Sequence, residues 1–581
     1  MHSILVANRG EIAVRVIRAA RDLGLRTVAI YSELDRDAVH VELADEAWNV
    51  GPAPAAESYL NVDRILEVAR EAGADAVHPG YGFLAENPAF AEAVIEAGLV
   101  WVGPPPAAIA MMGDKIVSRR TAEAAGVPGV PGTIDPLTSV EEARAFAAEH
   151  GYPIAIKAAG GGGGRGMKVV RGDDELDAAF EAAAREAEAW FANPEVYLEK
   201  YLEKARHVEA QVLFDRHGNG VFLGERDCSL QRRHQKLVEE TPAPGLPDDL
   251  RAAIGEAALA VARAADYESA GTVEFLVVGD AFYFLEMNTR IQVEHTITEE
   301  VTNVDLVAEQ LRIAAGEPLS ISAAPRPVGH AIELRINAED PAHDFRPDPG
   351  TLATYREPAG PGVRVDSGVR QGSVISQYYD NLIAKLVVRG RDRDEAIRRA
   401  RRALREFVVE GVATTIPAHL RILEHDEFLA GDYDTRLVED RMDFSDLPPT
   451  ATTTLPEEEE LVERSVTVEV GGKRFKVRYW SPVLAAPSGS VRPAPRRRPP
   501  KRSRTGPGGG GEGIVTAPMQ GTVVKIHHKA GEAVTQGEPV CVLEAMKMEN
   551  EIVAPTSGEI VDLRVQVGDS VSAGSVLMVI R

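Results

Sequence analysis

Cysteine and long apolar runs are scarce in this sequence. Its 581 residues include only two cysteines, Cys228 and Cys541, which excludes a disulfide framework or a cysteine-rich metal cluster and suits a reducing compartment. The first residues lack an apolar signal region, and no apolar run is long enough to span a membrane. We therefore expect a cytoplasmic protein with no membrane partner.

Basic residues are also in the minority. Lys and Arg together number 64 against 89 Asp and Glu, a net charge of −25, and a surface of this kind repels phosphate backbones. This charge argues against nucleic acid as a partner. Only 13 of the basic residues are lysine, so a position that keeps lysine is informative.

The composition is typical of several folded domains. The chain is 44% hydrophobic and 26% charged, and its length suggests about three to five domains. We predict a multidomain α/β and α+β protein with domains over residues 1–112, 113–320 and 329–446, a connector over 447–512 and a last domain over 513–581.

In the first domain, short apolar runs alternate with amphipathic segments, which predicts a parallel sheet with helices. Its first turn has a single glycine, Gly10, so the three-glycine dinucleotide fingerprint is absent. The connector contains a predicted hairpin over residues 465–480, with Gly471-Gly472 at the turn. Residues 487–513 are mostly Pro, Gly, Ser and Arg and predict a flexible tether.

The last domain contains an internal repeat. Ala517-Pro518, Gly521, Val524, Gly531, Val534 and Gly537 recur 37 positions later, from Ala554-Pro555 to Gly574. Two copies of one short-stranded unit predict a small β-sandwich with a pseudo-twofold axis. The segment between the copies, residues 544–549, should lie at one tip, and Lys547 is at its centre.

A glycine run follows an apolar strand that ends in Lys157. Residues 160–164 are all glycine, and glycine lets backbone N–H groups close over a phosphate chain while lysine supplies a charge. The Gly-x-x-x-x-Gly-Lys-Ser/Thr pattern of nucleotide P-loops is absent. A flexible surface loop is the alternative, but Lys157 at the strand end favours phosphate binding.

Residues 272–288 predict a hairpin with a carboxylate on each strand. Glu274 and Glu286 can face each other only if the connection has an odd number of residues, and we predict a connection over residues 279–281. Asn288 then points the same way. Two carboxylates and an amide oxygen suit a hard cation such as Mg²⁺, which typically adds phosphate oxygens and water to such a set.

A solvated polar face is the alternative for this hairpin. Apolar residues argue against it, since we expect Tyr283 and Leu285 to bury the other face and Phe284 to cover part of the carboxylate face. A metal site is therefore the favoured interpretation.

Arg290, Gln292 and Glu294 follow directly. In an extended segment their side chains project together as a cation, an amide donor and a carboxylate. Such a set could hold a small planar oxyanion and remove its proton. Alternating polar residues usually mark a solvated strand, but their place beside the metal hairpin favours a site. For Lys115 and Lys236, phosphate binding and plain surface charge fit the spacing equally well.

Together these segments resemble the biotin carboxylases of the ATP-grasp superfamily over about residues 1–446. The matching segments are Asn8-Arg9-Gly10-Glu11-Ile12-Ala13, His78-Pro79-Gly80-Tyr81-Gly82-Phe83-Leu84, the glycine run, and residues 225–236, 286–295 and 335–340. Glu544-Ala545-Met546-Lys547-Met548 resembles the attachment site of a biotinyl carrier domain; lipoyl domains share that fold but lack the methionine pair.

This resemblance implies a fold and a set of functional residues. The fold is a biotin carboxylase N-terminal parallel-sheet domain, an ATP-grasp domain with a glycine-rich lid, a biotin carboxylase C-terminal domain and a small all-β biotinyl (lipoyl-like) sandwich. ATP would be bound by Lys115, Lys157, Gly163, Gly164, Glu199, Lys200, Tyr201, Leu202, His207, Gln231 and His234. Mg²⁺ or Mn²⁺ would be held by Glu274, Glu286 and Asn288, and bicarbonate by Lys236, Arg290, Gln292 and the Val293 backbone.

The implied reaction is the ATP-dependent carboxylation of biotin carried covalently by Lys547. Glu294 would be the base that removes the bicarbonate proton, and the oxyanion would attack the γ-phosphorus to give carboxyphosphate, which yields CO2 and phosphate. The phosphate would take the N1′ proton of biotin, and Arg335 would stabilise the enolate-like oxygen. Lys236 and Arg290 complete the implied catalytic set.

The order of domains implies partners. A biotin carboxylase and a carrier on one chain, without a carboxyltransferase, resemble the alpha chain of an acetyl- or propionyl-CoA carboxylase, a ligase of the kind used in fatty acid biosynthesis. A carboxyltransferase beta subunit, a biotin protein ligase and a hetero-oligomer are implied. Larger relatives have a long bridging domain, for which the connector leaves little room, and the 465–480 hairpin is our candidate for a reduced bridge.

Three alternatives stay open on the sequence. The final acceptor could be methylcrotonyl-CoA or pyruvate, or the chain could be a different ATP-grasp ligase that acts on a free metabolite. A scaffolding or biotin-storage chain with a silent catalytic region is the third. Every polar position needed for ATP, metal and bicarbonate is filled, which argues against that last alternative.

Overall fold

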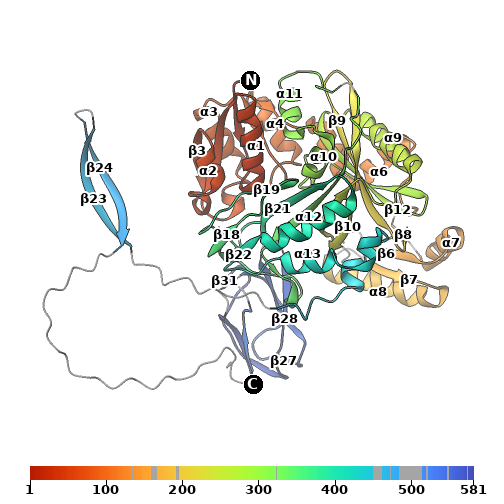
Figure 1. Ribbon diagram of the computed structural model, residues 1–581. Helices are drawn as coiled ribbons and strands as arrows, with labels where there is room; N and C mark the ends of the chain where they lie inside the picture. Colours follow the sequence, from red (N-terminus) through yellow and green to blue (C-terminus); the bar gives the residue numbers. More distant parts are fainter. Residues whose placement is uncertain are drawn as a thin grey trace. The chain divides into compact units, whose positions relative to one another are not determined.

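The structure, a computed structural model, divides into two compact units, residues 1–450 and 451–581, and each is described by itself (Figure 1). It describes residues 1–133, 136–137, 139–158, 167–191, 195–321, 323–448, 461–470, 473–482, 513–518, 521–545, 548–571 and 574–581. Gly163, Gly164, Lys547 and residues 487–512 of the predicted tether lie outside the described residues.

A five-stranded parallel sheet begins the first unit. Its order is β3-β2-β1-β4-β5, with β1 at Ser3–Val6, β2 at Arg26–Ser32, β3 at Glu46–Gly51, β4 at Ala76–His78 and β5 at Val100–Trp101. All of β1 is buried, because Ile4 packs in the cluster of α1 (Gly10–Asp22) and Leu5 in that of α3 (Val62–Glu71) and α4 (Pro88–Glu96). The predicted parallel α/β domain is confirmed.

An eight-stranded antiparallel sheet forms the centre of the first unit (Figure 1). Its order is β13 (Ala281–Asn288), β12 (Ser269–Val278), β9 (Arg206–Phe214), β10 (Gly220–Arg232), β11 (Gln235–Thr241), β14 (His330–Asn337), β21 (Leu382–Gly390) and β19 (Val363–Ser367). Residues 238–241 of β11 pair with residues 331–334 of β14. The two predicted domains on either side of residues 320–329 therefore share one sheet.

Helices cover this sheet. α9 (Asp248–Ala264) packs against β9, β10 and β12, and α12 (Arg393–Glu406) packs against β14 and β21. α10 (His295–Thr302) contacts β10, β11, β14 and β21, while α11 (Leu306–Ala314) contacts β12 and α1. The contact with α1 joins the core of the parallel sheet to this layer.

A separate three-stranded sheet has the order β7 (Met167–Val170), β6 (Ile154–Ala158), β8 (Val196–Lys200). α7 (Val140–His150) and α8 (Asp173–Phe191) accompany it and contribute to its own small apolar cluster. The glycine run falls between β6 and β7.

The other elements of the first unit are short. They are η1 (Glu33–Asp35), α2 (Val39–Leu43), η2 (Ala55–Glu57), α5 (Pro106–Gly113), α6 (Lys115–Ala124), β15 (Glu339–Asp340), η3 (Pro341–His343), β16 (Arg346–Pro347), β17 (Gly350–Thr351), β18 (Thr354–Arg356), β20 (Val374–Ile375), β22 (Val408–Glu410), α13 (Ile416–Ile422), α14 (Asp426–Ala430) and α15 (Leu437–Asp440). Among the described residues, the structure contains no helix with the length and apolar character needed to cross a membrane.

The hairpin of β12 and β13 places Glu274 opposite Glu286, as predicted. The predicted three-residue connection is wrong, because Val278 pairs with Ala281 and the turn contains only residues 279–280. With a two-residue turn and regular pairing, Glu274 would lie opposite Leu285, and Glu286 would point to the other face of the hairpin. One extra residue on β13 forms a β-bulge next to the Glu274 pair, and this bulge restores their opposition.

The bulge also corrects the predicted faces of β13. Phe284 pairs with Phe275 and is buried on the apolar face, whereas the sequence predicts it on the carboxylate face. Tyr283 pairs with Leu276 on the opposite face from that predicted, and Leu285 is 43% exposed instead of buried. Each difference follows from the single inserted residue, since one step along a strand reverses the face.

The second unit contains the predicted hairpin and the predicted sandwich. β23 (Leu461–Val470) pairs with β24 (Lys473–Pro482), so the hairpin is longer than residues 465–480. The sandwich has one sheet of β25 (Ile514–Thr516), β32 (Val576–Ile580), β30 (Gly558–Leu563) and β27 (Ala533–Val534), and another of β29 (Met548–Val553), β28 (Pro539–Ala545), β26 (Gly521–Ile526) and β31 (Ser570–Val571).

The two sheets repeat each other. Moving each strand by 37 positions turns β26 into β30, β27 into β31 and β28 into β32, so the strand orders of the two sheets are equivalent. Their inner faces form one apolar cluster that includes Val523 and Ile560, the same position of the two copies. The predicted all-β sandwich with a pseudo-twofold axis is confirmed.

Gly329, directly before β14, and Gly316, shortly after α11, give a matched test of close backbone packing. Both have positive φ, +82° and +89°, but a Cβ at Gly329 would lie 2.2 Å from the Gly390 carbonyl oxygen, whereas one at Gly316 would meet nothing within 4 Å. We expect Gly316→Ala to cost only about 1–2 kcal/mol for its backbone conformation, and Gly329→Ala to cost more. Thermal unfolding followed by circular dichroism measures both, and equal losses would contradict the close-approach argument.

Candidate active site

Lys236, on β11, lies at the centre of a buried cluster of charges. Its ammonium donates hydrogen bonds to Glu209 at 2.6 Å, to Glu294 at 2.7 Å and to Glu274 at 3.0 Å. Glu209 on β9 and Glu274 on β12 are opposed in the sheet, and Glu294 directly precedes α10. These three carboxylates are at most 5% exposed. The sheet therefore brings carboxylates from distant segments to one lysine.

Glu294 is held between two cations. Besides Lys236, the Nη2 of Arg335 donates to its Oε2 at 2.9 Å. Burial alone would raise the pKa of the Glu294 carboxyl, but Lys236, Arg335 and Arg226 outweigh burial and hold this pKa well below its usual range. Glu294 is therefore ionised, and it becomes a stronger base only when these cations turn to another anion.

Arg335, on β14, is anchored from one side. Its Nε donates to Oε1 of Glu239 at 2.6 Å, and its Nη2 forms an ion pair with the same oxygen at 2.5 Å. Thr415 and His419 contact its carbonyl oxygen, each at 2.7 Å, and so fix the backbone. In the part of the chain that the structure describes, Nη1 is the guanidinium nitrogen without a hydrogen-bond partner.

Arg290 and Gln292 join the cluster, but not by the predicted geometry. The backbone from residue 289 to 294 bends and turns, and Glu294 has φ −79° and ψ 10°, so the expected extended segment is wrong. Arg290 donates to Gln292 Oε1 and to Asn288 Oδ1, both at 3.0 Å. Gln292 donates to Glu274 at 3.3 Å. The segment meets the cluster through Glu274 and Lys236.

Glu274, Glu286 and Asn288 form the predicted metal set. Asn288 Nδ2 donates to Glu274 at 3.0 Å, and burial together with the charge of Glu274 raises the pKa of the Glu286 carboxyl. A divalent cation would offset the repulsion behind this shift, and the set of carboxylate and amide oxygens fits Mg²⁺. Such a cation would neutralise charge on phosphate oxygens.

His207 connects the metal set to the predicted nucleotide residues. Its Nε2 lies 2.9 Å from Glu274 Oε2. Burial would lower the pKa of the imidazole, but Glu274 outweighs it and raises that pKa. A positive imidazole here is suited to contact with phosphate oxygens.

The other predicted nucleotide residues lie in three places. Lys157 on β6 forms an ion pair with Glu199 on β8, while Lys200 turns away and donates to the Gly151 and Tyr152 carbonyl oxygens at 3.0 Å. Tyr201 and Leu202 follow β8, and the Tyr201 hydroxyl accepts from Arg436 at 2.7 Å. Gln231 is opposite Lys236, and exposed His234 has φ +62° in the turn between β10 and β11.

Lys115 stands apart. It is exposed at the first position of α6, whose N-terminus is capped by Asp114, and it takes no part in the hydrogen-bonded cluster around Lys236.

Sequence reasoning missed several residues that build this site. Arg226 is 0% exposed and donates to Glu209 at 2.5 Å, to Gln211 at 2.7 Å and to Thr298 at 2.9 Å. Glu86, from the loop after β4, accepts from Arg290 at 2.9 Å. Both lie in or next to the segments that carry the family resemblance, but their partners are far away in sequence.

Buried Lys385 on β21 was also missed. Its ammonium donates to the Val293 carbonyl oxygen at 2.9 Å and lies 3.0 Å from Glu11 of α1. Val293 is predicted to bind bicarbonate through its backbone. Its carbonyl oxygen is thus held by a lysine on β21, two strands away from Lys236 on β11.

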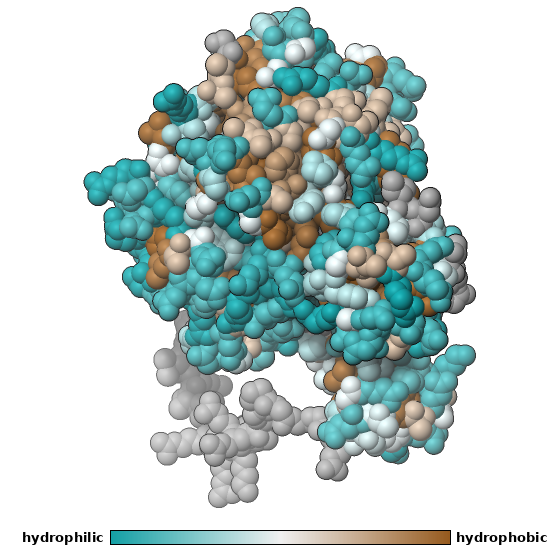
Figure 2. Space-filling model, turned by 90° about the vertical axis from the view of Figure 1, so that its right-hand side faces the viewer, coloured by the Kyte–Doolittle hydropathy of each residue, from teal (hydrophilic) through white to brown (hydrophobic). Residues whose placement is uncertain are grey.

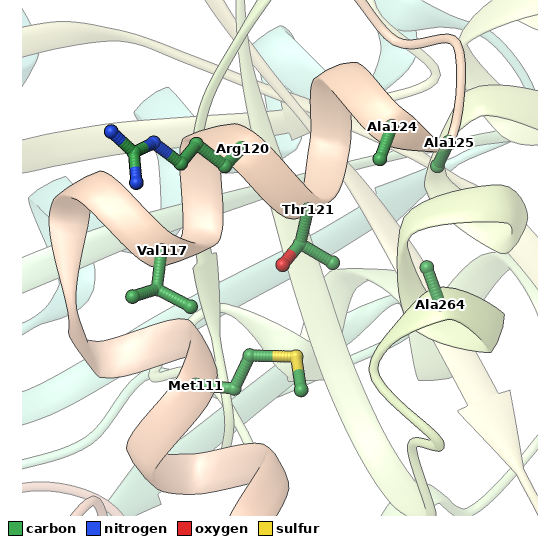
Figure 3. Close-up of a pocket in the computed structure, with 7 residues that line it drawn as sticks. All are labelled: Met111, Val117, Arg120, Thr121, Ala124, Ala125 and Ala264. Atoms are coloured by element: carbon green, nitrogen blue, oxygen red, sulfur yellow. The ribbon is translucent and has the colours of Figure 1, made fainter. Parts of the chain in front are cut away.

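A surface hollow lies away from this cluster. It has a volume of about 480 Å³ and is lined by Met111, Val117, Arg120, Thr121, Ala124, Ala125 and Ala264 (Figure 3). Most of its walls come from α6 and its C-cap, with Met111 from α5 and Ala264 from the end of α9. The face on the right of Figure 1, where α6 and α9 are labelled, carries patches of apolar surface (Figure 2). The hollow includes none of the predicted site residues.

Family models match the chain in four successive segments. They are the biotin carboxylase N-terminal domain at residues 1–109, the ATP-binding domain of the carbamoyl-phosphate synthase L chain at 114–322, the biotin carboxylase C-terminal domain at 333–440 and a domain described as biotin-requiring enzyme at 514–580. The chain is 52% identical to the biotin-dependent acyl-coenzyme A carboxylase alpha3 subunit of Mycobacterium leprae, over 94% of this chain and 93% of that protein. The chain belongs to the alpha subunits of biotin-dependent acyl-CoA carboxylases.

This alpha subunit is also similar to other relatives. It is 39% identical to the propionyl-CoA carboxylase alpha chain of Ruegeria pomeroyi, over 94% of this chain and 95% of that one. The biotin carboxylase domain of Hydrogenobacter thermophilus 2-oxoglutarate carboxylase, solved with MgADP, ADP and bicarbonate, matches with a TM-score of 0.69 and 48% identity, over 75% of this chain and 96% of that one. The alpha subunit is therefore an ATP-dependent ligase that carboxylates biotin, and it uses covalent biotin, ATP and Mg²⁺.

Two arginine ion pairs of different burial test the cost of opening this cluster. Arg226 and Glu209 are both 0% exposed, whereas Arg216 and Glu268 are 44% and 29% exposed. We expect Arg226→Ala to destabilise the protein by about 3–5 kcal/mol, since it removes one partner of a fully buried ion pair and leaves Glu209 with Lys236 as its remaining cation. Arg216→Ala should cost at most about 1 kcal/mol. Denaturant unfolding measures both, and a similar loss in the two variants would refute the assigned importance of the buried pair.

Proposed function

We propose that the alpha subunit carboxylates biotin on Lys547 for transfer to acetyl- or propionyl-CoA by a separate carboxyltransferase beta subunit. The similarity to an acyl-CoA carboxylase alpha subunit extends over 94% of the chain and so includes the carrier as well as the carboxylase. A biotin protein ligase would attach the biotin, and the working enzyme would be a hetero-oligomer in the cytoplasm. Methylcrotonyl-CoA or pyruvate would be the acceptor in the alternative proposal.

The observation that carries the proposed chemistry is the contact of Lys236 with three carboxylates. Bicarbonate would enter between Lys236, Arg290, Gln292 and the Val293 backbone. An anion there would draw the Lys236 ammonium away from Glu294, and the pKa of Glu294 would then rise from its low value. Glu294 would thus become the base for bicarbonate only once bicarbonate is bound.

ATP would lie between the three-stranded sheet, the turn that joins β10 to β11 and the metal set. Lys115, Lys157, Gly163, Gly164, Gln231 and His234 would contact it together with residues 199–202 and His207, and Glu274, Glu286 and Asn288 would hold the Mg²⁺ on its phosphates. Phosphoryl transfer needs mainly positioning and neutralisation of charge, which such residues provide. Arg335 would contact the biotin oxygen that becomes negative.

The domain boundaries belong to the same proposal. We assign the carboxylase to residues 1–112, 113–320 and 329–446, the connector to 447–512 and the biotinyl carrier to 513–581. The 465–480 hairpin is the proposed contact with the beta subunit.

Glu294→Gln tests the assigned base. It removes the proton acceptor but keeps the shape of the side chain, so we expect kcat for bicarbonate-dependent ATP cleavage to fall by about 100-fold or more with little change in nucleotide affinity. Turnover assays and calorimetric titration with ATP measure the two effects. Glu300→Gln, on α10 and with a side chain that is 27% exposed, is the control. An equal loss of ATP binding in Glu294→Gln would count against the assignment.

Lys547 and the acceptor can be tested in one preparation. We expect the chain co-produced with a biotin ligase to gain the mass of one biotin, and Lys547→Ala to gain none. The native complex should then carboxylate acetyl- or propionyl-CoA only with the unmodified chain. Longer acyl-CoA, methylcrotonyl-CoA, pyruvate and free metabolites are tested beside them, and carboxylation of a free metabolite by Lys547→Ala would overturn the carrier scheme.

A further inference from the structure

Two buried carboxylates lie next to Arg335 and have no role in the proposed reaction. Glu239 on β11 and Glu333 on β14 are directly opposed in an antiparallel pair, and both are 0% exposed. Opposed side chains in such a pair have Cβ atoms about 5 Å apart. The sheet therefore places these two acidic side chains beside each other on one face, in the interior of the first unit.

On each of the two side chains, one carboxylate oxygen has a partner and the other has none among the described parts of the chain. Arg335 directs both Nε and Nη2 to Oε1 of Glu239, and the Thr296 hydroxyl contacts Oε2 of Glu333. Within the described residues, Glu239 Oε2 and Glu333 Oε1 have no hydrogen-bond partner. Two ionised carboxylates placed in this way would repel each other and keep two buried oxygens unsatisfied. A single proton between them removes both penalties.

We propose that Glu239 and Glu333 share one proton, and that the ionised Glu239 is a positioning residue that orients Arg335 for the biotin half of the reaction. This inference rests on the role that the proposed function gives to Arg335. The pair presents one negative charge to the guanidinium, and that charge engages Nε and Nη2. Nη1 stays available for the biotin oxygen.

Charged and titratable groups face the pair from each neighbouring element. They are Lys236 on β11, Cys228 on β10, Arg335 on β14, Lys385 on β21 and Glu294 before α10. Burial raises the pKa of Glu239 to about 7 although Arg335 opposes the shift. Burial, with a contribution from Glu239, raises the pKa of Glu333 well above its usual range although Lys385 opposes it. Glu239 therefore ionises around neutral pH, whereas Glu333 still holds the shared proton there and loses it as the pH rises further.

Loss of this proton has a direct consequence for Arg335. A second negative charge next to the guanidinium weakens its attraction for the negative oxygen that develops on biotin. Biotin-dependent turnover should therefore fall at alkaline pH with the titration of the pair.

Infrared spectroscopy tests the shared proton without turnover. At neutral pH, the spectrum of the full chain minus that of Glu333→Gln should show the C=O stretch of a protonated carboxyl group, and the band should vanish as the pH rises. Glu309→Gln is the control, because it removes another buried carboxylate, on α11. The spectrum of this variant should keep the C=O band of the unmodified chain. No band in the difference spectrum would overturn the proposal. If Glu333→Gln does not fold, Glu333→Asp replaces it. A C=O band at the same frequency in Glu333→Asp as in the unmodified chain would then also overturn the proposal.

Kinetics test the link to Arg335. With free biotin as substrate, Glu333→Gln fixes a single charge on the pair, so its kcat should stay within about threefold of the unmodified chain while the alkaline fall moves to higher pH or disappears. Glu239→Gln removes the anchor of Arg335 and should lower kcat by about 100-fold, the loss that a misplaced catalytic group can cause. Glu309→Gln should keep the original pH profile.

Two kinetic results would overturn the proposal: an unchanged alkaline fall in Glu333→Gln, or an unchanged kcat in Glu239→Gln. Failure of the proposed function looks different. It would appear as a lack of bicarbonate-dependent ATP cleavage in the unmodified chain, and the infrared result would be unaffected by it.

Discussion

The attraction between the Lys236 ammonium and three buried carboxylates is the interaction on which the rest of the first unit depends. Glu209, Glu274 and Glu294 would repel one another strongly in the interior, and each is also stabilised by a further cation or donor: Arg226 for Glu209, His207 for Glu274, Arg335 for Glu294. Buried charges are tolerated only when paired in this manner. The same pairing keeps the residues of the implied bicarbonate and metal sites next to each other.

Much of the architecture could be predicted from local patterns. The alternation of strand and helix periods in the first hundred residues predicts the parallel sheet, and the 37-residue repeat predicts both sheets of the carrier. These predictions succeed because each depends on residues close in sequence, where hydrophobic period and turn residues decide the structure. The opposition of Glu274 and Glu286 was also predicted, but for the wrong reason.

What the sequence could not predict depends on distant partners. The bulge on β13 inserts one residue where no glycine or proline marks it, and it is set by pairing with β12. Glu209 and Glu239 sit in strands whose polar residues give no local sign of burial, and their partners Arg226 and Arg335 lie 17 and 96 positions away. The turn at Glu294 is fixed by the start of α10 and by cations from other strands, so an extended reading of that segment fails.

The cluster draws on all three predicted domains of the first unit. Glu86 from the parallel-sheet domain holds Arg290, Glu11 from α1 pairs with Lys385, and the pairing of β11 with β14 joins the remaining two domains in one sheet. No single carboxylase domain is thus a portable module: a chimera that exchanges one of them with a relative would mix mismatched halves of the same ionic network. The carrier has its own closed core within the second unit, so exchanging it for that of a relative would leave this ionic network intact.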